Sequence, residues 1–88
     1  MNIPTHYVTF AEYHNRIGHA CDPTDFDGAC DAYAECRSDG QDACVMRYDP
    51  PIGNKSGMMI DVTEDANRRI SMRYRQRYQD APEWLVAS

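Results

Sequence analysis

Apolar residues recur at helical spacing between positions 24 and 39, where the chain is most regular. They share one face of the predicted helix: Phe26, Ala29, Cys30, Tyr33 and Ala34. Acidic residues occupy every fourth position on the opposite face: Asp27, Asp31, Glu35 and Asp39. At a rise of about 1.5 Å per residue, neighbouring acids stand about 6 Å apart along the axis. The pattern predicts an amphipathic helix whose outer side carries these four carboxylates, which we term the acid row.

The chain before this helix is expected to hold a short strand and a first helix. Residues 5–8 could form an edge strand or only a lead-in. The run that follows has the residues of a capping box, with Thr9 as N-cap and Glu12 three positions later. We therefore expect a helix that ends near Cys21. Its buried side chains would be Phe10, Tyr13 and Ile17.

The chain after the acidic helix changes to strand periodicity. Residues 43–48 alternate between the two faces of a strand, and the apolar run 58–62 would be the returning strand. The intervening segment 49–57 is rich in proline and glycine, which indicates a loop. A two-stranded hairpin is marginal alone, so residues 5–8 are the candidate third strand.

A long C-terminal helix is expected from about Asp61 or Thr63 towards Pro82, which would stop it. Its apolar positions recur at intervals of four residues: Ala66, Ile70, Tyr74 and Tyr78. Trp84 follows in a short last turn, and we expect it to dock on the core and hold the C-terminal segment in place.

These elements predict one α+β domain spanning residues 1–88, because a chain of this length supports a single modest core. The expected order is (β)ααββα. It comprises a helix pair, then a β-hairpin or small antiparallel sheet, then the long C-terminal helix.

The charges are unevenly placed along the chain, whose net charge is −5. Residues 22–49 carry eight acids and two arginines, whereas residues 66–79 carry five arginines and no acid. An acidic balance argues against non-specific binding of nucleic acid by the whole molecule. It is compatible with a basic partner, or with a local basic patch that acts alone.

The acid row is the strongest candidate site. Like charges four residues apart repel on a helix, and a helix that only needed solubility would interleave lysines. The spacing of about 6 Å resembles that of phosphates along one nucleic-acid strand. We therefore expect the row to bind a basic groove of a nucleic-acid-handling protein, with a solvated helix face as the alternative. Three further acids would widen this surface: Asp22, Asp25 and Asp42.

The arginines of the last helix suggest a second possibility. Arginine beside tyrosine suits phosphate contact and base stacking, so this helix could bind nucleic acid directly in a small regulatory module. The residues concerned are Arg68, Arg69, Arg73, Arg75 and Arg77. The competing interpretation is that the tyrosines are core residues and the arginines pair with the chain's own acids or are solvated.

The cysteines and histidines permit a third hypothesis, a zinc-stabilised structural module. His14, His19 and Cys21 could combine with one of three further cysteines: Cys30, Cys36 or Cys44. Zinc ligands usually come as closely spaced pairs, and only His19 and Cys21 are close in the chain. Small buried cysteines are the simpler expectation. We predict no metal, no cofactor and no catalytic residue, because no constellation meets the geometric requirements of an active site.

The N-terminal residues show no signal peptide, so we expect a cytoplasmic protein with reduced thiols and no membrane segment. Disulfides between Cys21 and Cys36, or between Cys30 and Cys44, are the alternative for an exported chain. In size and charge layout the protein resembles the inhibitors that phages and mobile elements use against host machinery, anti-CRISPR proteins among them. That resemblance implies a stoichiometric, non-enzymatic inhibitor; the oligomeric state is left open.

Overall fold

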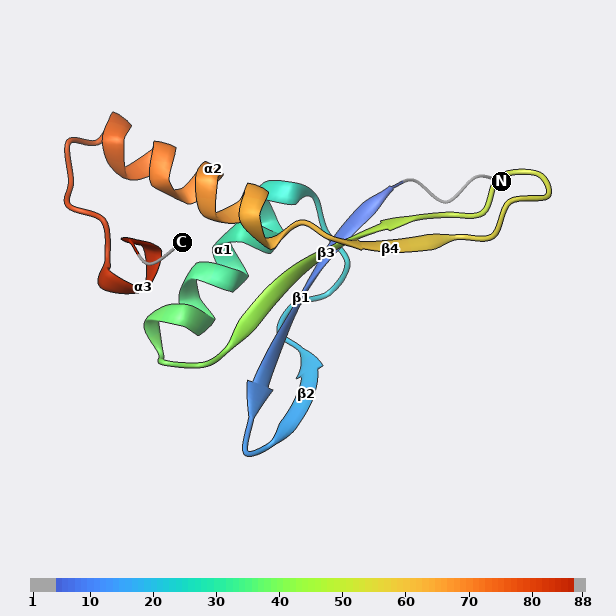
Figure 1. Cartoon of the computed structure of the whole chain (residues 1–88), viewed down its shortest axis with the longest axis horizontal. Coiled ribbons are helices and arrows are strands. Elements are labelled where there is room, and N and C mark those ends of the chain that lie inside the picture. The colour runs from blue at the N-terminus through green and yellow to red at the C-terminus, as the bar shows by residue number, and fades with distance from the viewer. Residues whose placement is uncertain (1–4, 87–88) are drawn as a thin grey trace.

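The computed structural model describes residues 5–86 and has the extents 46 × 33 × 19 Å. The helices gather at one end, and two hairpins extend away from them (Figure 1). The elements in chain order are β1 (His6–Tyr13), β2 (Arg16–His19), α1 (Phe26–Ser38), β3 (Ala43–Asp49), β4 (Met58–Asp61), α2 (Thr63–Gln76) and α3 (Glu83–Val86). The predicted α+β class is confirmed.

The four strands form one antiparallel sheet in the order β2-β1-β3-β4. The long strand β1 lies inside the sheet, because it pairs with β2 along one edge and with β3 along the other. Its register with β3 sets Val8 opposite Met46 and Phe10 opposite Cys44. Residues 5–8, the candidate third strand, therefore lie largely in the start of β1.

The prediction of a helix after Thr9 is wrong, because this part of the chain forms β1 and β2, which are joined by a two-residue turn. His14 and Asn15 both have positive φ, 50° and 63°, as the tight hairpin turn that matches strand twist requires. Thr9 is fully buried in β1 and does not cap a helix. The pairing of β1 with two neighbouring strands satisfies its backbone on both edges, which a short isolated helix could not match.

The predicted order (β)ααββα is therefore wrong as well; the chain runs ββαββα and ends in the short α3. The expected long C-terminal helix stops at Gln76, well before Pro82. Tyr78 adopts a left-handed conformation with φ of 54°, which ends the helix before the proline does. The four-residue α3 is the last helix of the described chain.

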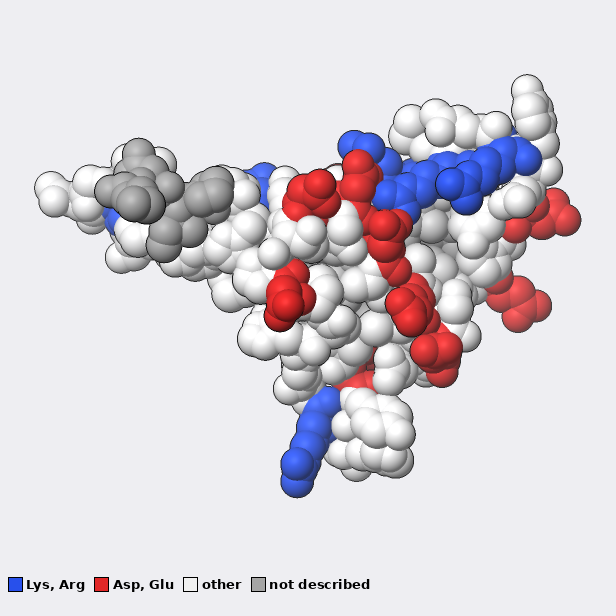
Figure 2. Space-filling view, turned by 180° about the vertical axis from the view of Figure 1, so that it is seen from behind, with Lys and Arg blue, Asp and Glu red and all other residues white. Residues whose placement is uncertain are grey.

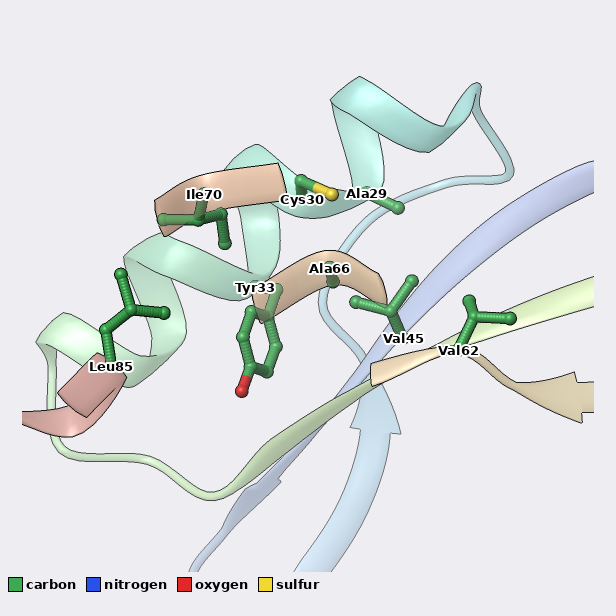
Figure 3. Close-up of a cluster of buried hydrophobic side chains, with 8 residues drawn as sticks. All are labelled: Ala29, Cys30, Tyr33, Val45, Val62, Ala66, Ile70 and Leu85. Atoms are coloured by element: carbon green, nitrogen blue, oxygen red, sulfur yellow. The ribbon is translucent and has the colours of Figure 1, made fainter. Parts of the chain in front are cut away.

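Both long helices pack on the same side of the sheet. Thr9 donates a hydrogen bond from Oγ1 to the Ala29 carbonyl of α1 at 2.6 Å. The Val45 amide of β3 donates to Thr63 Oγ1 at the start of α2, at 3.0 Å. The buried cluster between these layers is shown in Figure 3 and consists of Ala29, Cys30, Tyr33, Val45, Val62, Ala66, Ile70 and Leu85.

The C-terminal segment is held on this core, as predicted for Trp84. Its ring packs edge-on against Tyr33, with 5.8 Å between ring centroids, and the neighbouring Leu85 is buried in the cluster. None of the helices in residues 5–86 combines the length and the apolarity that crossing a bilayer demands.

Candidate acidic interaction surface

Helix α1 presents the acid row because its opposite face is anchored in the core. Ala29, Cys30 and Tyr33 are buried against the sheet and α2. Asp25 caps the helix by accepting a hydrogen bond from the Gly28 amide at 2.8 Å. At the other end Gly40 takes the left-handed conformation, with φ of 81°, that commonly follows a helix. The acids of α1 form a diagonal line across the molecule in Figure 2.

The first half of the row is paired with arginines of α2. Arg73 donates from Nη2 to Asp27 Oδ1 at 2.9 Å and from Nη1 to Asp31 Oδ1 at 2.7 Å. Arg69 donates from Nη1 to the same Asp27 oxygen at 3.3 Å. Figure 2 shows this contact where the line of acids meets the arginines of α2. The two arginines lie one helical turn apart, as the two aspartates do, so the two helices match each other in spacing.

These ion pairs remain open to solvent. The side chains of Asp27 and Asp31 are 57% and 72% exposed, and exposed pairs typically contribute about 0.2–1 kcal/mol each. Partial burial of the Arg73 guanidinium acts to lower its pKa, but hydrogen bonds to Asp27 and Asp31 outweigh that effect and raise it. Arg73 therefore stays charged, and the cluster orders the two carboxylates without removing them from the surface.

The second half of the row, Glu35 and Asp39, has no ion pair with any residue in the described part of the chain. Both residues line a cleft of about 630 Å³ between α1 and the hairpin of β1 and β2. Tyr13 and Arg16 line the cleft from the hairpin side. This end of the row therefore offers carboxylates without arginine partners next to a concave surface.

The three acids expected to widen the surface have different environments. Asp25 is the N-cap of α1, so its carboxylate already accepts a hydrogen bond. Asp42 lies 3.6 Å from Arg37, with its side chain 84% exposed. Asp22 is exposed in the segment before α1. The acids with the fewest local partners are thus Asp22, Glu35 and Asp39.

The alternative arginine site of α2 is largely engaged within the chain. Arg68 pairs with Asp65 on its own helix, and Arg69 and Arg73 hold the acid row. Tyr74 packs against the core, as the competing interpretation of the tyrosines expects. The exposed remainder comprises Arg75, Arg77 and Tyr78, whose side chain is 97% exposed.

All four cysteines carry free thiols. Burial raises the pKa of Cys30 to about 11, and it also raises the pKa of Cys36 and Cys44. Cys30 belongs to α1 and lies on the helix side of the sheet, whereas the side chain of Cys44 points to the other side. A disulfide between them would therefore have to cross the sheet. Within residues 5–86, no three His, Cys, Asp or Glu side chains are placed to hold a metal ion. The described residues therefore offer no set of ligands for a zinc ion.

The burial of Cys30 predicts a clear order of thiol reactivity. In the folded protein at neutral pH, we expect iodoacetamide to alkylate Cys30 at least about tenfold more slowly than Cys21, because the thiolate is the reactive form and Cys30 is buried and protonated. Peptide mass spectrometry over a time course measures both rates. Unfolding in urea should make the rates equal, and equal rates in the native protein would contradict this placement.

Sequence reasoning located the acid row but not the residues across the cleft. The predicted first helix places Tyr13 on its buried face, whereas the structure places Tyr13 and Arg16 on neighbouring strands beside α1. The run of β-branched and aromatic residues from Tyr7 to Phe10 was the available signal for a strand.

No protein-family model, no curated protein and no solved structure shows a significant match to this chain.

Proposed function

We propose that this chain is a non-enzymatic interaction protein whose acid row binds a basic surface of a nucleic-acid-handling protein or complex. The observation that carries the proposal is the continuous exposure of the row along α1, including Glu35 and Asp39, which lack ion pairs among the described residues. Carboxylates about 6 Å apart present charge at intervals similar to those of phosphates on one strand. A groove built for nucleic acid would accept such a row.

The two halves of the row contribute differently to binding in this proposal. Asp27 and Asp31 each use Oδ1 to bind α2, and no hydrogen bond from the described residues reaches their Oδ2 atoms. They present a pre-ordered but partly neutralised surface. Glu35 and Asp39 supply the carboxylates without arginine partners, and the cleft beside them has room for a lysine or arginine side chain of the partner. Preordering lowers the entropic cost of binding.

The mode of action follows from the chemistry of the surface. A protein that occupies a nucleic-acid groove blocks that groove in a stoichiometric complex without breaking any bond. This is the mode of inhibitors that phages and mobile elements direct against host defence, such as anti-CRISPR proteins, and it would act in the cytoplasm. Direct binding of nucleic acid by this segment is less favoured, because three of the five arginines between Arg68 and Arg77 already pair with acids of this chain.

Reversing the charges of Glu35 and Asp39, the second half of the row, tests the proposal. We expect the double variant Glu35→Lys/Asp39→Lys to lose at least about tenfold in affinity for captured partners, because it places cations opposite cations. The immobilised protein is incubated with bacterial lysate and washed first at about 50 mM and then at about 500 mM NaCl, since salt screens exposed charges. Proteins released by the salt step are identified by mass spectrometry, and nucleic-acid-binding proteins are expected.

A matched control separates the row from net charge. The variant Glu64→Lys/Asp80→Lys changes the charge by the same amount at two exposed acids outside the row, and it should retain the same partners. Equal losses for both variants would contradict the proposal, as would capture that salt does not weaken. A mobility shift of labelled DNA or RNA by the unmodified protein would favour the α2 alternative.

A further inference from the structure

The outer edge of β4 is open in the described chain. This strand lies at the end of the sheet, and within residues 5–86 it pairs with β3 alone. Three of its four residues are exposed, and its hairpin extends away from the helices (Figure 1). An edge strand presents backbone donors and acceptors that can pair with a further strand. The edge of β4 is therefore a place where another chain can join the sheet.

The strand register identifies the backbone groups that point out of this edge. The Val62 amide donates to the Val45 carbonyl at 2.9 Å and so continues the ladder between β3 and β4. Because every second residue of a strand bonds to the same neighbour, Ile60 and Met58 also turn their amide and carbonyl groups towards β3. The residues whose groups point outward are Gly57, Met59 and Asp61. Outside the ladder, no backbone hydrogen bond from residues 5–86 reaches these three.

The two edges of the sheet differ in how well they resist pairing. Strand β2 carries Arg16 and has Gly18 in its interior, and both a charge and a glycine weaken pairing at an edge. Strand β4 contains no lysine, arginine, proline or glycine, and Met58 and Met59 are 60% and 49% exposed. Its single charge is at its end, where the Asp61 carboxylate accepts a hydrogen bond from the Thr63 amide at 2.8 Å. The edge of β4 is thus apolar and lacks the usual protection.

We propose that β4 pairs with β4 of a second copy, so that the two sheets join edge to edge into one continuous sheet. A two-fold axis perpendicular to the sheet sets the two strands antiparallel, with Met59 opposite its own counterpart. Gly57 then lies opposite Asp61 of the other copy, and each opposed pair exchanges two hydrogen bonds. This register uses every outward group and keeps the two aspartates apart. The edge is therefore self-complementary, as an isologous interface requires.

A hollow at the corner between β4 and α2 supports this register. It measures about 410 Å³, and the carboxylates of Asp61, Glu64 and Asp65 are among the groups that line it. Asp65 has an arginine partner on its own helix. Glu64 has no ion pair with any residue in the part of the chain that the structure describes. The hollow therefore offers negative charge at the end of the open edge.

The second copy brings a cation to this hollow. In the proposed register its chain runs from Gly57 back along the edge towards the corner. Two residues before Gly57 is Lys55, the only lysine of the chain, which is exposed. By symmetry the contact between Lys55 and Glu64 forms twice, once at each end of the paired strands. Charge complementarity thus selects the same register as the hydrogen bonds.

The interface is small, so the expected dimer is weak. One pair of short strands with a charged contact at each end buries on the order of 800 Å² in total, below the range of stable complexes. Opposite Met58 lies Ile60 of the other copy, which adds apolar contact on the helix side. We expect a dissociation constant of about 100 µM. The acid row belongs to α1 and takes no part in the pairing, so the dimer does not depend on the proposed function.

Sedimentation velocity and amide exchange on the full chain test the dimer and its location. From about 10 µM to 1 mM protein, the average mass should rise from the 10.1 kDa of one chain towards twice that value. In hydrogen exchange followed by NMR, the Met59 and Asp61 amides should exchange about threefold more slowly at about 1 mM than at about 50 µM. The amides of Met58 and Ile60 bond to β3 and should exchange equally at both concentrations.

A lysine at the centre of the edge should prevent pairing. Met59→Lys sets two cations opposite each other across the axis, and we expect it to raise the dissociation constant at least about tenfold. The matched control is Met72→Lys on α2, at a residue that is 53% exposed against 49% for Met59. The control should dimerise like the unmodified chain.

A charge exchange tests the register. Lys55→Glu should raise the dissociation constant about tenfold, because it sets an acid against Glu64 at both ends of the interface. The double variant Lys55→Glu/Glu64→Lys should return it to within about threefold of the unmodified value. An unmodified chain that stays monomeric at about 1 mM overturns the proposal. So do equal dissociation constants for the Met59 and Met72 variants, a charge exchange that restores nothing, or a dimer in which exchange of the Met59 amide is unchanged.

Discussion

Replacing Ile70 with alanine is expected to lower the free energy of unfolding by about 3 kcal/mol, because it removes a fully packed side chain and leaves a cavity. Ile70 is 2% exposed and projects from α2 into the buried cluster that this helix shares with α1 and the sheet (Figure 3). Only Ala66 and Ile70 of α2 are buried among the described residues, so Ile70 supplies most of the apolar contact that docks this helix. Urea unfolding followed by circular dichroism measures the loss.

The control for this variant is Ile52→Ala. It removes the same atoms from a side chain that is 76% exposed in the loop between β3 and β4. The expected change is within about 0.5 kcal/mol, as is usual at surface positions. Similar losses at Ile70 and Ile52 would mean that α2 is not docked as described. A loss of 3 kcal/mol is large for a domain of this size, whose total stability is about 5–10 kcal/mol.

The docking of α2 also determines which carboxylates of the acid row form ion pairs. Ile70 follows Arg69 directly and stands one turn before Arg73, so the residue that buries the helix also positions both arginines over Asp27 and Asp31. The surface is therefore a property of two helices in register. A variant that loosens α2 would free these carboxylates and change the row without altering any of its residues.

Much of the fold could be predicted from local patterns. Helix α1, strands β3 and β4 and the start of α2 agree with their predicted ranges within a few residues. In each, periodicity and breaker residues agree, as with Gly40 after α1 and the Pro- and Gly-rich loop 49–57. Consistency between local signals is what makes a segment predictable.

The hairpin of β1 and β2 could not be recognised from the same kind of signal. Phe10, Tyr13 and Ile17 are spaced three and four residues apart, which imitates a helix face. In the sheet, Tyr13 and Ile17 point to opposite sides, and both are largely exposed. The decisive interaction is the pairing of β1 with β3, which lies more than 30 residues away in the chain.

The candidate surface was predictable in its residues but not in its partners. The acid row follows from spacing within one helix. Its pairing with Arg69 and Arg73 depends on how α1 and α2 lie against each other, and the cleft beside Glu35 and Asp39 depends on where the β1–β2 hairpin lies. Both are long-range features that a single sequence leaves undetermined.

A substitution at Thr9 distinguishes a helix that begins at this residue from a strand in which it is buried. Aspartate is a favoured N-cap, so Thr9→Asp would be tolerated if a helix began there. In β1, Thr9 is fully buried and its Oγ1 lies 2.6 Å from the Ala29 carbonyl oxygen. A carboxylate at this place would be buried against an acceptor without a cation. We expect Thr9→Asp to cost about 4 kcal/mol of the free energy of unfolding.

Thr9→Ser provides the matched control, because it keeps the hydroxyl donor and removes only one methyl group. Its expected cost is about 1 kcal/mol, which is the price of a small cavity alone. Both losses are measured by urea unfolding at neutral pH. An aspartate variant as stable as the unmodified chain would contradict the buried strand and, with it, the packing of α1 on the sheet. A large loss for aspartate beside a small one for serine would show that the Thr9 hydroxyl is buried against α1, the helix that carries the acid row.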